Sequence, residues 1–212
     1  MIEVCPTITA SDLHEYRKQM ELVGNFAGRI HIDLMDGDFA PTKSPDLSKT
    51  WWPDNIKADL HLMYRYPLDY LDTIISLHPN LVIIHAEAEG NFRHYSKVLH
   101  KHNIKVGVCL LPETDPVIIK PALQLIDHVL IFSGKLGYHG GVANLELLDK
   151  VKIIKEWNRN VEMGWDGGIN ESNAKQLIDG NIDTLNVGGG IHSASDPAKA
   201  YQTLRSITDV KT

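Results

Sequence analysis

Ionisable side chains stand at regular intervals in two short and otherwise apolar segments of this 212-residue chain. The segments read HIDLMDG at residues 31–37 and DLHLM at residues 59–63. Successive side chains of an extended strand point to opposite faces, which places His31, Asp33 and Met35 on one face. Asp59, His61 and Met63 share one face of the second segment for the same reason. Both segments therefore predict strands with one apolar and one ionisable face.

These ionisable faces predict a metal site. Burying an unpaired imidazole or carboxylate costs free energy, so His31, Asp33 and His61 need a common partner, and a divalent ion is one such partner. A further carboxylate, Asp166, ends a late apolar run and is followed by two glycines that let the backbone turn sharply or approach a ligand. A single inward histidine is more often a hydrogen-bonded core residue, but the grouping of four favours the ligand role.

Eight apolar runs predict the strands that must position these groups. They cover residues 3–8, 29–34, 58–63, 81–85, 105–110, 128–132, 161–166 and 184–187. Helical patterns lie between most of them, with start signals before Leu13, Leu145, Ala174 and Ala198. Residues 38–55 contain three prolines and two tryptophans and read as a long loop with one helical turn. The pattern predicts an α/β protein: one (β/α)8 TIM barrel over residues 1–212 rather than an open doubly wound sheet.

The carboxyl ends of the strands carry the chemistry in such barrels. Thr7, Asp33, His61, His85 and Asp166 all fall at or near the ends of their predicted strands. Glycine-rich turns follow strands six, seven and eight, and their bare N–H groups could converge on an anion, so we expect a phosphate site there. The residues expected to form it are Gly140, Gly141, Gly167, Gly168, Gly188 and Gly189.

Composition narrows the range of partners. The net charge of −6 and the pI near 6.0 leave no basic stripe, so we expect no nucleic acid partner. The two cysteines, Cys5 and Cys109, lie far apart in apparent strands, which suggests free thiols in a reducing cytosol. No leader pattern is seen, and no apolar run approaches the roughly 18 residues of a membrane span. We therefore expect a cytoplasmic protein without a membrane partner.

The H-x-D-x-M-D-G and D-x-H-L-M segments and the late D-G-G make the sequence resemble the ribulose-phosphate 3-epimerase family over nearly the whole chain. Its opening is similar too, with Thr7 where the family has a serine that touches substrate. The resemblance implies Met35 and Met63 in a sulfur-rich lining beside the ene-diolate. It also implies one divalent ion per chain (Zn, Fe, Mn or Co), held by His31, Asp33, His61 and Asp166.

The activity implied by the resemblance is epimerisation at C3 of a ketose phosphate, D-ribulose 5-phosphate to D-xylulose 5-phosphate, in the pentose phosphate pathway. Inverting C3 requires removing a proton beside the C2 carbonyl from one face and returning one to the other. Asp33 and Asp166 are the expected acid–base pair, and a Lewis acid would lower the cost of the ene-diolate. The resemblance also implies a homo-oligomer that binds a small sugar phosphate.

Several positions depart from the family pattern. Phe132 stands where the family has a methionine, and the loop over residues 133–142 is one residue longer. Gly164 replaces a family glutamate, and Gly188 is followed by two further glycines where a serine or small residue is common. These changes affect the residues expected to contact the substrate. An allulose-6-phosphate 3-epimerase, or another sugar-phosphate epimerase, is therefore the alternative function.

Two other function classes stay open. A decarboxylase or aldol-type synthase on the same barrel would use a D-x-K-x-x-D pattern, but Met35 stands where its lysine would be. The other open class is a non-catalytic protein that binds a phosphorylated ligand.

His85 and Glu87 fit a site role or a structural one equally well. The remaining histidines are expected at the surface, among them His14, His94, His100, His102 and His128.

Overall fold

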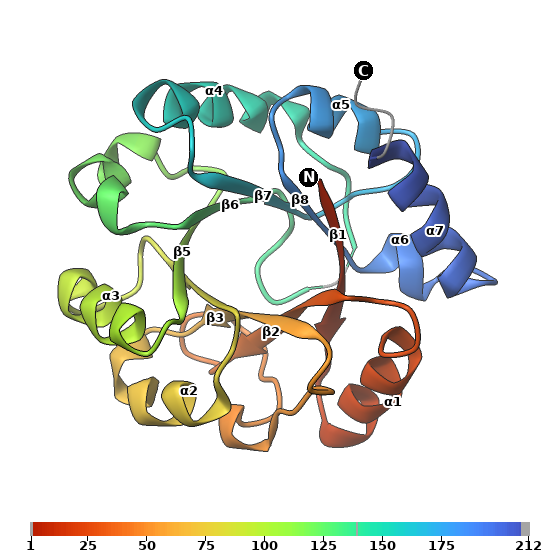
Figure 1. Cartoon of the computed structure of the whole chain (residues 1–212), viewed down its shortest axis with the longest axis horizontal. Coiled ribbons are helices and arrows are strands. Elements are labelled where there is room, and N and C mark those ends of the chain that lie inside the picture. The colour runs from red at the N-terminus through yellow and green to blue at the C-terminus, as the bar shows by residue number, and fades with distance from the viewer. Residues whose placement is uncertain (1, 139, 209–212) are drawn as a thin grey trace.

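Eight parallel strands close into a barrel in the computed structural model, in sequence order and with β8 pairing back onto β1 (Figure 1). The structure describes residues 2–138 and 140–208. The strands are β1 (Glu3–Thr9), β2 (Arg29–Met35), β3 (Lys57–Met63), β4 (Leu81–His85), β5 (Lys105–Leu110), β6 (His128–Phe132), β7 (Glu162–Asp166) and β8 (Thr184–Val187). The predicted TIM barrel is confirmed, and the bounds of each predicted strand lie within one residue of the observed ones.

Helices form the outer ring of the barrel (Figure 1). The α-helices are α1 (Leu13–Val23), α2 (Leu71–Leu77), α3 (Phe92–Lys101), α4 (Leu148–Trp157), α5 (Ala174–Asp179), α6 (Gly189–His192) and α7 (Pro197–Thr208). The more tightly wound 3-10 helices are η1 (Leu47–Lys49), η2 (Pro67–Tyr70), η3 (Pro116–Leu125) and η4 (Leu145–Leu147). Pro121 lies inside η3, where a proline cannot donate the backbone hydrogen bond that an α-helix needs. None of the helices in the described residues combines the length and apolar character needed to cross a membrane.

Helix α1 illustrates how the sequence sets these elements. Asp12 caps it, because its carboxylate accepts hydrogen bonds from the backbone N–H groups of His14 and Glu15. Tyr16, Met20 and Val23 recur at helical spacing and form its buried face. That face packs against the outward apolar side chains of the neighbouring strands, in the same core cluster.

Strand β2 has the two faces that its alternation predicts. Ile30, Ile32 and Leu34 point outward into the core beneath the helices and are fully buried. The register of β2 against β3 places Asp33 beside His61. Two residues of the predicted ionisable faces therefore meet directly inside the barrel.

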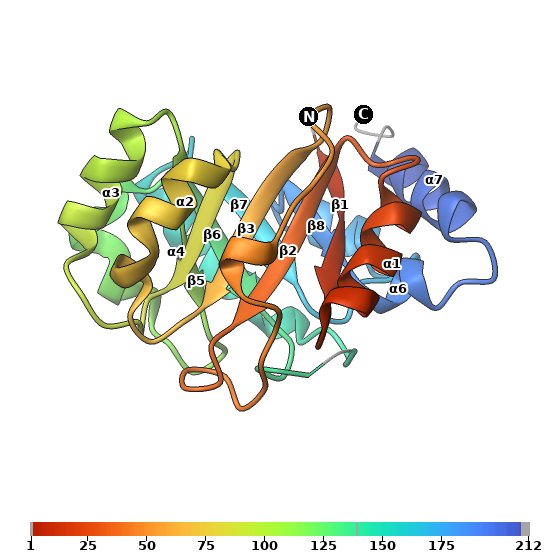
Figure 2. The ribbon, with the colours of Figure 1, turned by 90° about the horizontal axis from the view of Figure 1, so that it is seen from below.

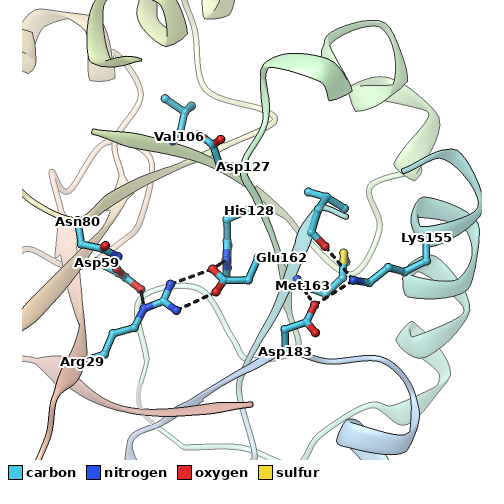
Figure 3. A network of polar contacts seen from close by, with 11 residues as sticks. Arg29, Asp59, Asn80, Val106, Asp127, His128, Lys155, Glu162, Met163 and Asp183 are labelled. Atoms are coloured by element: carbon cyan, nitrogen blue, oxygen red, sulfur yellow. Dashed lines mark hydrogen bonds and ion pairs between the residues drawn. The ribbon is translucent and has the colours of Figure 1, made fainter. Parts of the chain in front are cut away.

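A polar network fills the amino-terminal end of the barrel interior (Figure 3). Arg29 donates from Nε to Asp59 Oδ2 at 2.7 Å and from its two terminal nitrogens to both Glu162 oxygens at 2.9 Å. Asn80 donates to the second Asp59 oxygen at 2.6 Å. Asp59 thus lies inward as its alternation predicts, but it belongs to this ion-pair network rather than to the site at the other end.

His128 is part of the same network, so the expectation that it lies at the surface is wrong. Its ring is buried, and its Nδ1 lies 2.7 Å from Glu162 Oε2. As the first residue of β6 it faces the barrel interior, where Gly164 on β7 leaves room for the ring. A Cβ at Gly164 would lie 2.4 Å from His128 Nε2.

Long loops extend from the carboxyl ends of β2 and β6, on the lower side of the barrel in Figure 2. The loop after β2 contains only the three-residue helix η1, as its prolines predict. Thr42 in this loop donates a hydrogen bond at 2.9 Å to the carbonyl of Gly137 in the loop after β6. The two loops therefore meet over the same end of the barrel.

Candidate active site

Two histidines and two aspartates converge at the carboxyl end of the barrel. Asp33 Oδ1 lies 2.9 Å from His61 Nδ1 and 3.2 Å from His31 Nε2. Asp166 Oδ2 lies 3.9 Å from each of the same two nitrogens. Their ligand atoms all lie within 4.8 Å of one another, so strands β2, β3 and β7 bring the four predicted residues to one point.

This donor set fits a divalent metal ion. His31 is fully buried, and neither of its ring nitrogens makes a well-aligned hydrogen bond with the described residues. A buried imidazole without a hydrogen-bond partner is costly, and coordination to an ion would satisfy its Nε2. Two imidazoles with two carboxylates suit Zn²⁺, Fe²⁺, Mn²⁺ or Co²⁺, and the donor types do not distinguish these ions.

The two aspartates lie in different electrostatic surroundings. Burial raises the pKa of Asp33, but contacts with His31 and His61 outweigh burial and hold that pKa well below its usual range. Burial and the negative charge of Asp33 raise the pKa of Asp166 to about 7. Two carboxyl groups whose pKa values are pushed apart are the arrangement that acid–base catalysis uses.

A cavity of about 270 Å³ opens beside the aspartates at this end of the barrel. Asp33 and Asp166 line it, whereas His31 and His61 are fully buried next to it. Every other residue predicted to contact substrate also lines the cavity: Thr7, Met35, Met63, Gly140, Gly141, Gly167, Gly168, Gly188 and Gly189. Tyr138 lines it too, while its neighbour His139 lies outside the described residues.

The glycines of the cavity have two different local roles. A Cβ at Gly140, Gly141 or Gly189 would meet no atom within 4 Å, so these glycines border open space. Gly167 and Gly168 adopt positive φ angles of 109° and 71°, and a Cβ on either would collide with the backbone of the loop after β6. Gly167 and Gly168 therefore hold two loops together, and the first three leave room for a ligand.

Two further polar residues of the cavity were not anticipated. Thr9 donates from Oγ1 to Asp33 Oδ2 at 2.5 Å, because β1 and β2 pair Thr9 with Asp33. Asn186 is 2% exposed and lines the cavity, and neither its side-chain nitrogen nor its oxygen has a partner in the described part of the chain. Thr9 was predictable from the sequence, because it lies two residues after Thr7 and therefore shares its face of β1. No local sequence pattern distinguishes Asn186.

His85 lies directly behind His61. The Nε2 atoms of the two rings are 3.0 Å apart, and His85 Nδ1 is 3.7 Å from Glu87 Oε2. Burial lowers the pKa of His61 to about 3 and also lowers the pKa of His85, so both rings are neutral. His85 therefore contacts a site residue without lining the cavity.

Comparisons with known proteins agree with this geometry. The model of the ribulose-phosphate 3 epimerase family matches residues 3–192. The chain belongs to this family. Ribulose-phosphate 3-epimerase from Helicobacter pylori strain J99 is 29% identical over 97% of this chain and 98% of the relative. The Bacillus subtilis enzyme of the same name is 29% identical over 97% of this chain and 99% of the relative. The expectation of an isomerase of this epimerase family is confirmed.

Solved structures share the barrel of this epimerase family member at lower sequence identity. KGPDC from Streptococcus mutans aligns with a TM-score of 0.74 and 15% identity over 100% of this chain and 99% of that one. 3-Hexulose-6-phosphate synthase from Salmonella typhimurium aligns with a TM-score of 0.71 and 13% identity over 97% and 98% of the two chains. These likenesses support the fold.

Proposed function

We propose that this epimerase family member inverts C3 of a ketose phosphate, converting D-ribulose 5-phosphate to D-xylulose 5-phosphate. The observation that carries the proposal is the convergence of Asp33 and Asp166 on one cavity, together with two imidazoles. Family membership, and the names of the relatives, support the same reaction.

Proton transfer at C3 is assigned to the two aspartates. An ionised carboxylate removes the C3 proton, and a protonated carboxyl group on the other side returns one to the opposite face. Asp33 and Asp166 both line the cavity, so both carboxyl groups lie beside a substrate bound there. Thr9 holds the second oxygen of Asp33 and so fixes the direction of its carboxylate.

His31, Asp33, His61 and Asp166 are the residues that would hold a divalent ion. When bound, such an ion supplies a Lewis acid for the negative charge that develops on the substrate oxygens. Met35 and Met63 line the adjacent cavity wall, where apolar thioethers keep water out without donating a competing proton.

The glycine loops are assigned to the phosphate group of the substrate. Six glycines of these loops line the cavity: Gly140, Gly141, Gly167, Gly168, Gly188 and Gly189. Gly140, Gly141 and Gly189 border open space. Bare N–H groups of such loops bind a dianion well. The phosphorylated ketose should bind at least about tenfold more tightly than the free sugar, which corresponds to about 1.4 kcal/mol.

Incubation with ketose phosphates in deuterated water tests this function. We expect deuterium at C3 of D-ribulose 5-phosphate, together with formation of D-xylulose 5-phosphate. Metal binding without any exchange at C3 would instead indicate a non-catalytic protein for phosphorylated ligands. Equal rates with phosphorylated and free sugars would contradict the phosphate site.

Allulose 6-phosphate is the second candidate substrate. Phe132 and Asn186 line the cavity, and the first stands where the family has methionine, so the space around the sugar differs from the family pattern. Comparing kcat/KM for ribulose 5-phosphate and allulose 6-phosphate separates the two, since a strong preference for the hexulose would reassign the substrate.

Three further properties stay predictions. We infer one domain over residues 1–212, a homo-oligomer, and a cytoplasmic location without nucleic acid or membrane partners. Light scattering of the purified protein tests the oligomeric state, and fractionation of the source cells tests the location.

A further inference from the structure

A row of polar side chains leads from His61 away from the cavity. His61 Nε2 faces His85 Nε2 at 3.0 Å, and His85 Nδ1 faces Glu87 Oε2 at 3.7 Å. The other oxygen of Glu87 accepts a hydrogen bond from the hydroxyl of Thr114. The row therefore begins at the proposed metal ligand His61 on β3. It passes through His85 at the end of β4 and reaches the partly exposed carboxylate of Glu87.

The separation of the two rings requires one shared hydrogen. Two imidazole nitrogens at 3.0 Å form a hydrogen bond only when one carries a hydrogen and the other a lone pair. The rings of Phe39 and Phe132 pack against His85, with centroids 4.7 and 6.3 Å away. Because His85 is 1% exposed, the two imidazoles have each other as partners rather than water.

The direction of this hydrogen bond in the metal-loaded chain follows from what a metal ligand needs, whereas without an ion His61 Nδ1 would donate to Asp33 Oδ1, 2.9 Å away. A ligand nitrogen must be unprotonated, so His61 can offer Nδ1 only when its hydrogen is on Nε2. That hydrogen then points to His85 Nε2, which must accept it, and the hydrogen of His85 lies on Nδ1. There it faces the Glu87 carboxylate, which favours this tautomer by charge. With the hydrogen of His85 on Nε2 instead, the lone pair of its Nδ1 would face the negatively charged Glu87 carboxylate.

We propose that His85 and Glu87 are positioning residues, which orient His61 and hold its hydrogen on Nε2 so that Nδ1 is free to bind a divalent metal ion. This inference rests on the metal centre of the proposed function and adds its outer partners. Carboxylates behind ligand histidines serve other metal sites in the same way, and removing them typically costs 10–100-fold in metal affinity.

Cys109 raises an alternative role for His61 and His85, as ligands of a second metal ion. Ligand atoms of His61, His85 and Cys109 lie within 4.8 Å of one another and could bind a second ion. However, Cys109 is fully buried in an apolar cluster with Leu81 and Leu130, and this burial raises the pKa of its thiol. A second ion would also take the Nε2 lone pair that the ring pair uses. Cys109→Ala is therefore a matched control at the same depth of the barrel.

Metal affinity without substrate tests the inference. The wild-type chain and three variants, His85→Leu, Glu87→Gln and Cys109→Ala, are stripped with a chelator and titrated with Co²⁺ against a competing chelator. We expect His85→Leu to lose 10–100-fold in affinity and Glu87→Gln to lose about tenfold, with Cys109→Ala close to wild type. Nitrogen-15 NMR of the Zn²⁺-loaded wild type should show the His61 hydrogen on Nε2.

Wild-type affinity in both His85→Leu and Glu87→Gln would overturn the inference. So would two Co²⁺ ions per chain, one of them lost in Cys109→Ala. Glu87 is partly exposed, so Glu87→Gln keeps the test decisive if His85→Leu does not fold. A wild-type chain that binds no Co²⁺ would contradict the proposed metal centre itself, which separates that failure from failure of the positioning role.

Discussion

Asp33 and Asp36 lie three residues apart in one segment, yet their carboxylates face different surroundings. Asp33 contacts the two imidazoles inside the barrel. Asp36 accepts hydrogen bonds from the backbone N–H groups of Asp38, Phe39 and Arg65, so it organises the loop after β2. The direction in which each side chain points at the end of β2 thus separates the chemical role of Asp33 from the structural role of Asp36.

Replacement of the inward aspartates should abolish epimerisation. Asp33→Asn and Asp166→Asn each remove a proton-transfer group, which typically costs on the order of 10²–10⁴ in rate. Asp36→Asn is the matched control and should retain most of the activity. Exchange of the C3 proton into deuterated water measures all three, and equal losses at the three positions would contradict this assignment of roles.

His61→Ala should remove the bound divalent ion, because it deletes one of four converging ligands and leaves Asp33 without its 2.9 Å contact. Elemental analysis of the purified wild type and variant checks this. Replacing the exposed His14 by Ala is the control and should leave the metal content unchanged. The same metal content in wild type and His61→Ala would show that the ion lies elsewhere.

Strands β6 and β7 show how a departure from the family pattern is accommodated at the level of elements. The family glutamate expected at Gly164 is absent, and the His128 ring lies over that glycine instead. The ring is held by Glu162, two residues earlier on β7. The His128 ring from β6 therefore occupies the space that a side chain at position 164 of β7 would fill.

Gly164→Ala should destabilise the protein by about 1–3 kcal/mol, because the new Cβ would overlap a ring that its bond to Glu162 holds in place. For a chain of this length this lowers the Tm by very roughly 2–4 °C per kcal/mol. The double variant Gly164→Ala with His128→Ala should lose less than the two single losses together. Strict additivity in thermal unfolding would show that the two residues do not share this space.

The start of α6 allows a test of the phosphate site at the level of the loops. Gly189→Asp places a negative charge in open space beside the cavity, so it should weaken binding of a phosphorylated ketose at least about tenfold. Gly28→Asp adds the same charge in open space before β2, at the opposite end of the barrel. Calorimetric titration should show near wild-type binding in this control, and equal affinities in both variants would exclude the loop from phosphate binding.

Glu162 connects distant parts of the whole barrel, since it pairs with Arg29 from β2 and with His128 from β6 (Figure 3). Burial opposes ionisation of Glu162, but hydrogen bonds from Arg29 and His128 outweigh it and hold its pKa well below the usual range. A carboxyl group with a lowered folded-state pKa contributes stability above its unfolded pKa of about 4.3. That contribution is lost as the pH falls toward the folded-state value.

The free energy of unfolding of Glu162→Gln should therefore lie on the order of 3 kcal/mol below wild type at pH 7. The gap should narrow as the pH falls below about 4. Urea unfolding at several pH values measures it, with the exposed Glu21→Gln as control. A gap that stays constant down to acid pH would show that the charge of Glu162 contributes nothing to stability.

The sequence by itself determined the elements and their faces. Alternation with a period of two is a local property of an extended chain, so it placed His31 and Asp33 inward and predicted eight strands and the end of the barrel that carries the site. The late D-G-G and the glycine loops were likewise readable, because tight turns and close backbone contacts require glycine locally.

Only the tertiary structure decided which inward residues meet. The stagger between strands of a closed barrel sets the depth of each inward side chain, and no local pattern encodes that stagger. It set His128 and Asp59 at the amino-terminal end with Arg29, and His85 behind His61. The same stagger placed Thr9 against Asp33, whereas the type of each residue alone left these contacts undetermined.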